Sequence, residues 1–398
     1  MRKRYLPALV ALAAIAALAA GPSAQAHSAK ANSPKDHASP GAWTVVASGL
    51  DNPRGLTVAK NGDIWVAEAG RGGVGPCQPG EGGGTPSCFG TTGAFTLIHD
   101  GVQKRVVTGL PSFADQGTAD GVGAGDGAIG PSDIIITGRN LKATIGGGGG
   151  AAERADLVNT QHADPAALLF DTMLNIDPWS GRFKVFADLA AYETANNPDK
   201  GQIDSDAYGL AKRHGNYLLA DAAGNDVLRV RHKSGHISTL TVFPNVPNVP
   251  APAPPNGPGG TVDMQAVPTT IAVRDDDSHV YVGQLTGFPF PLGAATVWSV
   301  APNGDRTMFA TGFTNIIDIA FGKHGYLYVL EIAHNGLLSG DPEGALIKVS
   351  PDGKTQTPVA STGLVNPTGV AIARDGTVYV TNYGTSAGKG TVLSLGKV

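Results

Sequence analysis

The chain has 398 residues, of which 41% are hydrophobic and 16% charged, and its formal net charge at pH 7 is −4. This acidic balance argues against nucleic acid or an anionic membrane surface as a partner. After the first 26 residues, no apolar stretch approaches the length that a membrane-spanning helix needs. We expect a monomer with no membrane span and with enough residues for a large core.

Residues 1–26 have the features of a secretory signal peptide. A basic start, Met1 to Arg4, is followed by the apolar run from Leu6 to Ala20 and by a small-residue cleavage site that ends at Ala26. An uncleaved N-terminal anchor is the alternative. Residues 27–42 have no apolar periodicity and predict a disordered linker. We therefore expect a secreted, extracellular protein whose folded domain spans residues 43–398.

One hairpin unit occurs twice, at residues 52–70 and 366–384, with seven identical residues at a fixed offset. In each copy two apolar runs flank a turn with Asn-Gly or Asp-Gly, which is the strongest short-range signal for a β-hairpin. Four weaker copies lie between them and start at Asp133, Tyr208, Thr270 and Asp318. Repetition of a unit that needs partners for both faces predicts a repeat architecture.

Each hairpin is followed by a third strand, and five of the six third strands are followed by a fourth. Residues 43–50 resemble the missing fourth strand, since they read as a strand followed by Gly-Leu. An N-terminal strand that completes the last sheet closes a ring and removes its exposed edges. We predict an all-β fold, a six-bladed β-propeller of four-stranded antiparallel blades. A β-sandwich, the alternative, does not explain the repeating hairpin.

The two cysteines, Cys77 and Cys88, lie in a stretch rich in Gly and Pro where we expect no regular structure. In an oxidising compartment they most simply form a disulfide. A reactive or metal-bound thiol is the alternative. The glycine run at residues 146–150 lacks the Gly-Lys-Ser/Thr of a phosphate loop and predicts a flexible linker.

Strand order places the connection from second to third strand, and the connection from each blade to the next, on one face. The long connections fall on this face, which we call the long-loop face: residues 70–93, 112–132, 146–165, 188–206 and 243–261. Insertions confined to one face of a repeat protein usually mark its binding face. We expect a small molecule, a glycan or a protein to bind there.

Polar side chains recur on this face at equivalent strand ends. At the end of the second strand they are Glu68, Asp221, Gln284, Glu331 and Asn382; near the start of the first strand they are Arg54, Asp133, Asp206 and Asp318. Converging carboxylate and amide oxygens suit Ca²⁺, with Glu68, Asp221, Glu331 and Asn382 as candidate ligands. The alternative is that they cap strands and bond to backbone N–H groups.

Three segments carry a resemblance to a known family, namely residues 49–58, 125–133 and 363–370. With these motifs the chain resembles the ScyD/ScyE family of exported propeller proteins. Members in cyanobacteria are associated with making the pigment scytonemin, so the resemblance implies the fold and export but no settled activity. More distantly the blades look like NHL repeats and calcium-dependent gluconolactonases, whose metal ligands match no clear motif in this sequence.

Two functions follow as hypotheses. The first is a secreted binding scaffold that uses the long loops, since no Gly-x-Ser-x-Gly elbow supplies a nucleophile and the catalytic residues are unknown. The alternative is a calcium-dependent hydrolase or lactonase, with Glu68, Asp221, Glu331 and Asn382 around the cation. A quinone-dependent dehydrogenase is a weaker third possibility, because no convergent basic set serves an anionic cofactor.

Overall fold

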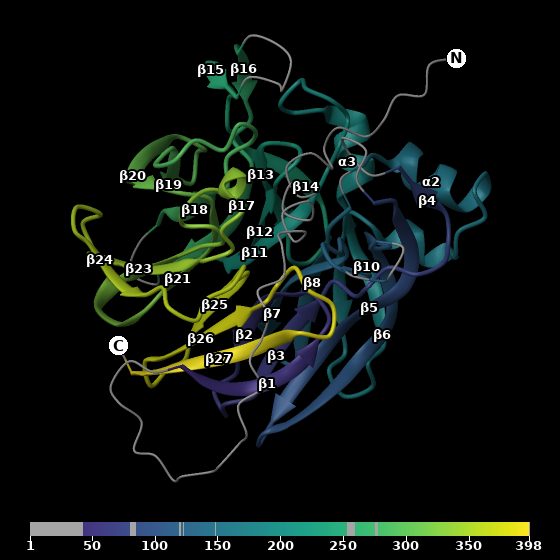
Figure 1. Ribbon diagram of the computed structural model, residues 1–398, viewed down its shortest axis with the longest axis horizontal. Coiled ribbons are helices and arrows are strands. Elements are labelled where there is room, and N and C mark those ends of the chain that lie inside the picture. The colour runs from purple at the N-terminus through teal and green to yellow at the C-terminus, as the bar shows by residue number, and fades with distance from the viewer. Residues whose placement is uncertain are drawn as a thin grey trace.

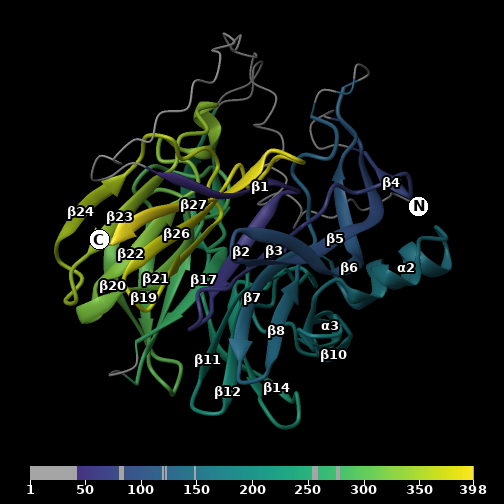
Figure 2. The same cartoon turned by 90° about the horizontal axis from the view of Figure 1, so that it is seen from below.

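The computed structural model describes residues 43–79, 85–118, 121, 123–147, 149–252, 259–274 and 278–397. In it, six antiparallel sheets form blades around a common centre (Figures 1 and 2). This confirms the predicted six-bladed β-propeller, and the sandwich alternative is wrong. The predicted signal peptide and linker, residues 1–42, lie outside the described residues.

Each blade has four strands, which follow one another from the centre of the ring outwards. In order of blades one to six, the innermost strands are β2 (Pro53–Val58), β7 (Pro131–Thr137), β11 (Ala207–Arg213), β17 (Pro268–Val273), β21 (Ile316–Phe321) and β25 (Gly369–Ile372). The second strands are β3 (Ile64–Glu68), β8 (Asn140–Ile145), β12 (Asn216–Asp221), β18 (Val280–Gln284), β22 (Leu327–Glu331) and β26 (Thr377–Asn382). The third strands are β5 (Ser87–His99), β9 (Thr172–Ile176), β13 (Asp226–Arg231), β19 (Ala295–Val300), β23 (Ala345–Val349) and β27 (Gly390–Lys397). The outer strands are β6 (Val102–Asp115), β10 (Phe183–Asp188), β14 (Ile237–Val242), β20 (Arg306–Phe313), β24 (Gln356–Ala360) and β1 (Thr44–Leu50).

The core lies between neighbouring blades. Second strands such as β3 and β22 are buried at every residue, because a blade is covered on both faces by its neighbours. Apolar clusters cross these boundaries; one joins Met173 of β9 to Leu219 of β12. Each innermost strand contacts the innermost strands of the two adjacent blades, so the inner strands form a closed ring.

The N-terminal strand closes the ring as predicted. β1 pairs antiparallel with β27, from Thr44 opposite Ser394 to Leu50 opposite Gly390. Blade six is therefore built from both ends of the described chain (Figure 1).

The long-loop face contains more regular structure than predicted. Its connections include β4 (Cys77–Gln78), the hairpin β15 (Val246–Ala251) to β16 (Gly260–Met264), and the helices α2 (Ala151–Asn159), η2 (Pro165–Leu169), α3 (Leu189–Asn196) and η4 (Leu337–Ser339). The short turn between β21 and β22 holds η3 (Lys323–Gly325). Within the described part of the chain, no helix has both the length and the apolar character needed to cross a membrane.

One expectation for blade one is wrong. We expected no regular structure around the cysteines, but β5 and β6 continue past the blade, pairing Ser87 with Asp115, and β4 adds to β5. Cys77 and Cys88 are paired in this ladder and form the predicted disulfide. Glycine allows the backbones to approach, since a Cβ on Gly90 would lie 2.0 Å from the carbonyl oxygen of Gly72.

The flexible linker expected at residues 146–150 is also wrong for the four glycines that are described. Gly146 donates to the carbonyl oxygen of Gly130 (2.8 Å), and the carbonyl oxygen of Gly149 accepts from Ser205 (3.2 Å). The N–H of Gly150 donates to Glu153 (3.1 Å). These bonds tie the glycines to blades two and three.

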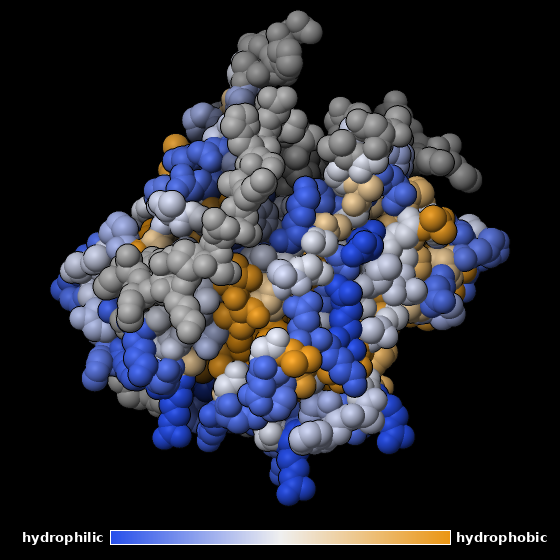
Figure 3. Space-filling model, turned by 60° about the horizontal axis from the view of Figure 1, so that its bottom comes forward, coloured by the Kyte–Doolittle hydropathy of each residue, from blue (hydrophilic) through white to orange (hydrophobic). Residues whose placement is uncertain are grey.

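On the side that Figure 3 shows, exposed apolar side chains form one patch near the middle and smaller ones elsewhere, among hydrophilic side chains. The most exposed large apolar residues, Val74 and Trp179, lie in different connections of the chain.

Candidate functional site

Four of the residues predicted at the ends of second strands hold the segment that leads into the same blade. Each buried side chain accepts a hydrogen bond from a backbone N–H 15 or 17 residues earlier. The pairs are Asp51 to Glu68 (2.7 Å), Asp206 to Asp221 (2.7 Å), Thr314 to Glu331 (2.6 Å) and Val365 to Asn382 (2.6 Å). We call these four side chains the latch residues. Their side chains accept hydrogen bonds from backbone N–H groups, which was the alternative to metal binding in the sequence analysis.

The structure does not assemble the latch residues as ligands of one ion. They belong to blades one, three, five and six, and each is turned to the start of its own blade. Among the residues described, no three His, Cys, Asp or Glu side chains are grouped so as to hold a metal ion. Gln284, the fifth residue at an equivalent strand end, accepts instead from the Trp298 indole (2.6 Å).

Opposite charges surround the latch residue of blade one. Arg105 donates to both carboxylate oxygens of Glu68, at 3.0 and 2.6 Å, and to Asp51 at 3.0 Å. Arg71 also pairs with Asp51. The hydrogen bond to Glu68 raises the pKa of Arg105. Two guanidinium groups thus offset two buried carboxylates.

The central channel is lined by residues of all six blades, which are Gly55, Ser132, Asp133, Tyr208, Gly209, Thr269, Ile317, Asp318 and Thr368. Its volume, including the open mouth, is about 200 Å³. Its narrow space and its polar lining suit water or a very small polar group.

Asp133 and Asp318 tie neighbouring blades together inside the channel. Asp133 accepts from Leu210 of the next blade (2.8 Å), and Asp318 accepts from Val370 of the next blade (2.7 Å). Each also accepts from the following residue in its own strand. Both line the channel, and desolvation raises the pKa of Asp133 well above its usual value and that of Asp318 to about 6.

Three buried polar atoms in the channel region have no hydrogen-bond partner: Nη1 of Arg54, Oδ1 of Asp206 and the hydroxyl of Tyr208. Desolvation raises the pKa of Asp206 to about 7 and that of Tyr208 to about 12, and the Arg54 charge opposes both shifts. Arg54 also donates to the carbonyl oxygen of Ala128 (2.6 Å). Two donors and one carboxyl group are thus available to a small polar molecule.

Sequence reasoning singled out Arg54 and Asp206 but missed Tyr208. The repeat contains the signal, because Tyr208 stands two residues after Asp206 and directly before Gly209. Arg54 has the same place between Asn52 and Gly55. Aligning the repeats on this glycine would have placed Tyr208 beside Arg54 at the channel.

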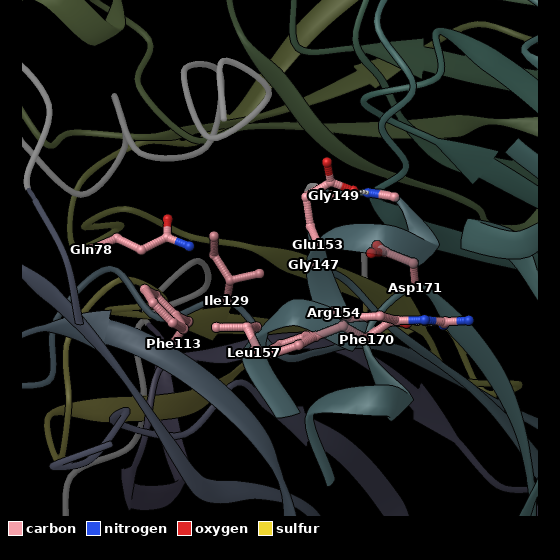
Figure 4. Close-up of a pocket in the computed structure, with 11 residues that line it drawn as sticks. Gln78, Phe113, Ile129, Gly147, Gly149, Glu153, Arg154, Leu157, Phe170 and Asp171 are labelled. Carbon is pink, nitrogen blue, oxygen red and sulfur yellow. Dashed lines mark hydrogen bonds between the residues drawn. The ribbon is translucent and has the colours of Figure 1, made fainter. Parts of the chain in front are cut away.

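A larger pocket opens on the long-loop face beside β6, α2 and η2 (Figure 4). Its volume, including the mouth, is about 450 Å³. It is lined by Gln78, Phe113, Ile129, Gly147, Gly149, Gly150, Glu153, Arg154, Leu157, Phe170 and Asp171. No candidate site residue from the sequence lies in this pocket, because its walls come from β6, α2 and connections of blades one and two rather than from equivalent strand ends.

The pocket has an apolar end and a charged end. Figure 4 shows Phe113, Ile129 and Leu157 at one end, and the carboxylates of Glu153 and Asp171 at the other. The backbones of Phe113 and Ile129 bond to each other at 2.8 and 2.9 Å, which fixes the apolar wall.

Helix α2 is fixed where it borders the pocket. Glu153 caps its start by accepting from Gly150, and an acidic residue in the first turn also suits the helix dipole. Arg154 donates to the carbonyl oxygen of Phe170 (2.7 Å) and to Asp188 (2.5 Å). Because its guanidinium is engaged there, the polar groups that face the pocket are chiefly acceptors.

The glycines between α2 and β8 connect the pocket to the channel region. The N–H of Gly147, which lines the pocket, bonds to the carboxylate of Asp206. A Cβ on the adjacent Gly146 would lie 2.3 Å from Oδ1 of Asp206. Only glycine allows this approach, so the pocket wall and the channel group are held against each other.

Solved structures with the same fold resemble the chain at low sequence identity. A putative oxidoreductase (glucose dehydrogenase) from Thermus thermophilus has a TM-score of 0.51 at 14% identity, covering 89% of this chain and 99% of that chain. A gluconolactonase from Xanthomonas campestris has a TM-score of 0.50 at 11% identity, covering 88% of each chain. A protein of unknown function from Bacteroides thetaiotaomicron has a TM-score of 0.51 at 11% identity, covering 89% of this chain and 72% of that chain.

At these identities the similarity shows the fold alone, a six-bladed propeller of the kind found in gluconolactonases. No family model and no curated protein sequence matches the chain. Membership of the ScyD/ScyE family stays a prediction.

Proposed function

We propose that this protein is a secreted binding propeller of the ScyD/ScyE type that holds a small molecule in the pocket between β6, α2 and η2. The observation that carries the proposal is the pocket itself. It combines an apolar end with a few polar groups, of which Asp171 and Arg154 are buried. It also lies on the face where the sequence concentrates its long connections.

The lining indicates the chemistry of the ligand. Phe113, Ile129 and Leu157 suit an apolar body, and Glu153 and Asp171 suit a hydrogen-bond-donating or cationic group at the other end. A glycan or a protein segment fits this division less well, because the pocket is small and one end is apolar.

A blocking substitution tests the proposal. Gln78 lies half-buried on the pocket wall, so Gln78→Trp should fill the pocket without opening the core. Val74→Trp adds a large side chain to the same connection at a fully exposed position outside the pocket and serves as the control. Small amphipathic compounds with an amine or hydroxyl group would be screened by the rise in Tm that they cause.

We expect hits to bind the wild type and Val74→Trp alike, and Gln78→Trp at least tenfold more weakly. Equal affinity for Gln78→Trp would contradict the assignment of the pocket. A complete absence of hits, with binding of glycan arrays instead, would contradict the ligand class.

The calcium-dependent hydrolase stays an untested alternative. A screen of lactones and esters with and without Ca²⁺ separates it from the binding scaffold. Hydrolysis that is lost in Glu331→Ala, but not in the exposed variant Asp100→Ala, would favour the hydrolase.

A further inference from the structure

Five carboxylates meet on the long-loop face of blade three. Asp221 and Asp226 stand opposite each other at the open end of the β12–β13 hairpin. Glu193 comes from α3, and Asp199 and Asp204 come from the segment between α3 and β11. The electrostatic influence of Asp221 and Asp199 raises the pKa values of both Glu193 and Asp226, which shows that these groups are close together. We call these five residues the blade-three cluster.

Two of these carboxylates have buried oxygens without hydrogen-bond partners. Asp226 is 1% exposed, and neither of its carboxylate oxygens has a hydrogen-bond partner. Glu193 is 2% exposed, and its Oε1 also has none. Such groups are costly in the ionised form, so desolvation raises the pKa of Asp226 well above its usual value and that of Glu193 to about 8.

In the described part of the chain, no ion pair to this cluster corresponds to those of the arginines in blade one. Arg71 and Arg105 offset Asp51 and Glu68 there, whereas every charged neighbour that shifts the pKa values of Glu193 and Asp226 is itself acidic. Desolvation and acidic neighbours also raise the pKa of Asp204 to about 7. The carboxylates around the latch residue of blade three are thus not offset by arginine side chains, as they are in blade one.

We propose that the blade-three cluster binds a divalent cation, and that the cation is Ca²⁺. Several carboxylate oxygens and no sulfur or imidazole ligand are the chemistry that calcium prefers, and calcium tolerates irregular geometry. Asp226 lies directly opposite Asp221 on the neighbouring strand, and we assign its unpartnered carboxylate as the central ligand. Only Asp221 is shared with the set of calcium ligands predicted from the sequence.

Part of the cluster is already oriented. Asp221 accepts from the Ser205 hydroxyl (2.6 Å) and from the N–H of Gly224 (3.1 Å), and Asn225 donates to Asp199 (3.1 Å). Among the residues described, no three such side chains already form a coordination shell. The ion therefore has to draw Asp226 and Glu193 towards the fixed groups, so that binding stabilises the fold.

The test compares thermal unfolding of the full chain at pH 7.5 in a chelator and in millimolar Ca²⁺. Asp226→Asn and Glu193→Gln remove carboxylates of the cluster. Asp100→Asn is the control, because its side chain is 90% exposed on a distant short turn. We expect Ca²⁺ to raise the Tm of the wild type and of Asp100→Asn equally. The increase in Tm with Ca²⁺ should be lost in Asp226→Asn.

In the chelator we expect Asp226→Asn to melt at or above the wild-type temperature, because the substitution replaces a buried carboxyl group whose ionised form has no partner. Titration calorimetry with Ca²⁺ should show at least a tenfold loss of affinity in this variant. If Asp226→Asn does not fold, Glu193→Gln carries the same test. A wild type that melts at one temperature in both solutions overturns the proposal, as does an unchanged calcium response in both cluster variants.

Discussion

At the scale of single residues, the latch residues show what a sequence pattern can and cannot predict. Their polarity and their recurrence at strand ends could be read from the repeats. Their partners could not, because carboxylates and amides serve equally well as metal ligands and as acceptors for backbone N–H groups. The repeats do contain one signal for these partners. Each latch residue stands 15 or 17 residues after the backbone N–H that it holds, in the segment that leads into its blade.

The latch of blade six makes a stability prediction. Asn382 accepts from Val365 (2.6 Å) and donates to the carbonyl oxygen of Gly363 (3.0 Å) in a buried setting. Asn382→Ala removes both bonds and should lower the free energy of unfolding by about 1–3 kcal/mol. Urea denaturation measures this, with the exposed Asn140→Ala as control. An equal effect of the two substitutions would show that the latch contributes nothing.

Asp204 makes a pH prediction with a definite sign. Desolvation, with the charge of Asp221 and other acidic neighbours, raises its pKa from 3.8 to about 7. A carboxyl group with a raised folded-state pKa stabilises the fold below pH 4, and this contribution is lost as the pH rises to about 7. In chelator, Asp204→Asn should therefore gain stability relative to the wild type between pH 4 and pH 8, by about 1 kcal/mol or more.

Urea denaturation across that pH range gives the difference in stability between Asp204→Asn and the wild type, from which titrations unaffected by Asp204 cancel. Asp100→Asn is the exposed control. A difference that stays constant with pH would contradict the pKa shift of Asp204.

Among the elements, the strands of the blades were predictable. The continuation of β5 past the blade and the helices α2 and α3 were not. The hairpins follow from apolar runs and turn residues. The continuation of β5 through Gly90 and Gly93 has low intrinsic β propensity and depends on pairing with β6 and β4. Helices α2 and α3 have only 9 and 8 residues, so tertiary contacts such as those of Arg154 stabilise them more than their own propensity does.

Strand β1 makes a prediction of its own. A chain that begins at residue 51 lacks β1 and leaves β27 as an exposed edge, whereas a chain that begins at residue 43 keeps the strand. Loss of the buried Leu50 and Ala47 side chains alone should lower the free energy of unfolding by about 3 kcal/mol or more. Denaturation of the two chains and their aggregation, measured by light scattering, provide the test. Equal stability would show that β1 does not hold the ring closed.

At the scale of the whole molecule, the repeats predicted the ring and its closure, but the pocket depends on where separate loops meet. The binding face was inferred from loop length, whereas the walls of the pocket come from β6, α2 and the chain around Asp171. Such sites arise from packing between segments that share no repeat position. The channel is more regular, and one alignment of the repeats would have shown that Arg54 and Tyr208 occupy equivalent positions at it.

The place where the ring closes, the pairing of β1 with β27 in blade six, also has a consequence for how the protein folds. We call this pairing the seam. Gly388 donates to Asp51 across the seam, between residues 337 positions apart in the sequence. Blade six therefore cannot form until the five blades between its two parts have brought them together, which makes its closure a late and slow event. Until then β1 and β27 both present unpaired edges, and the period of greatest risk for aggregation is the interval before the seam forms.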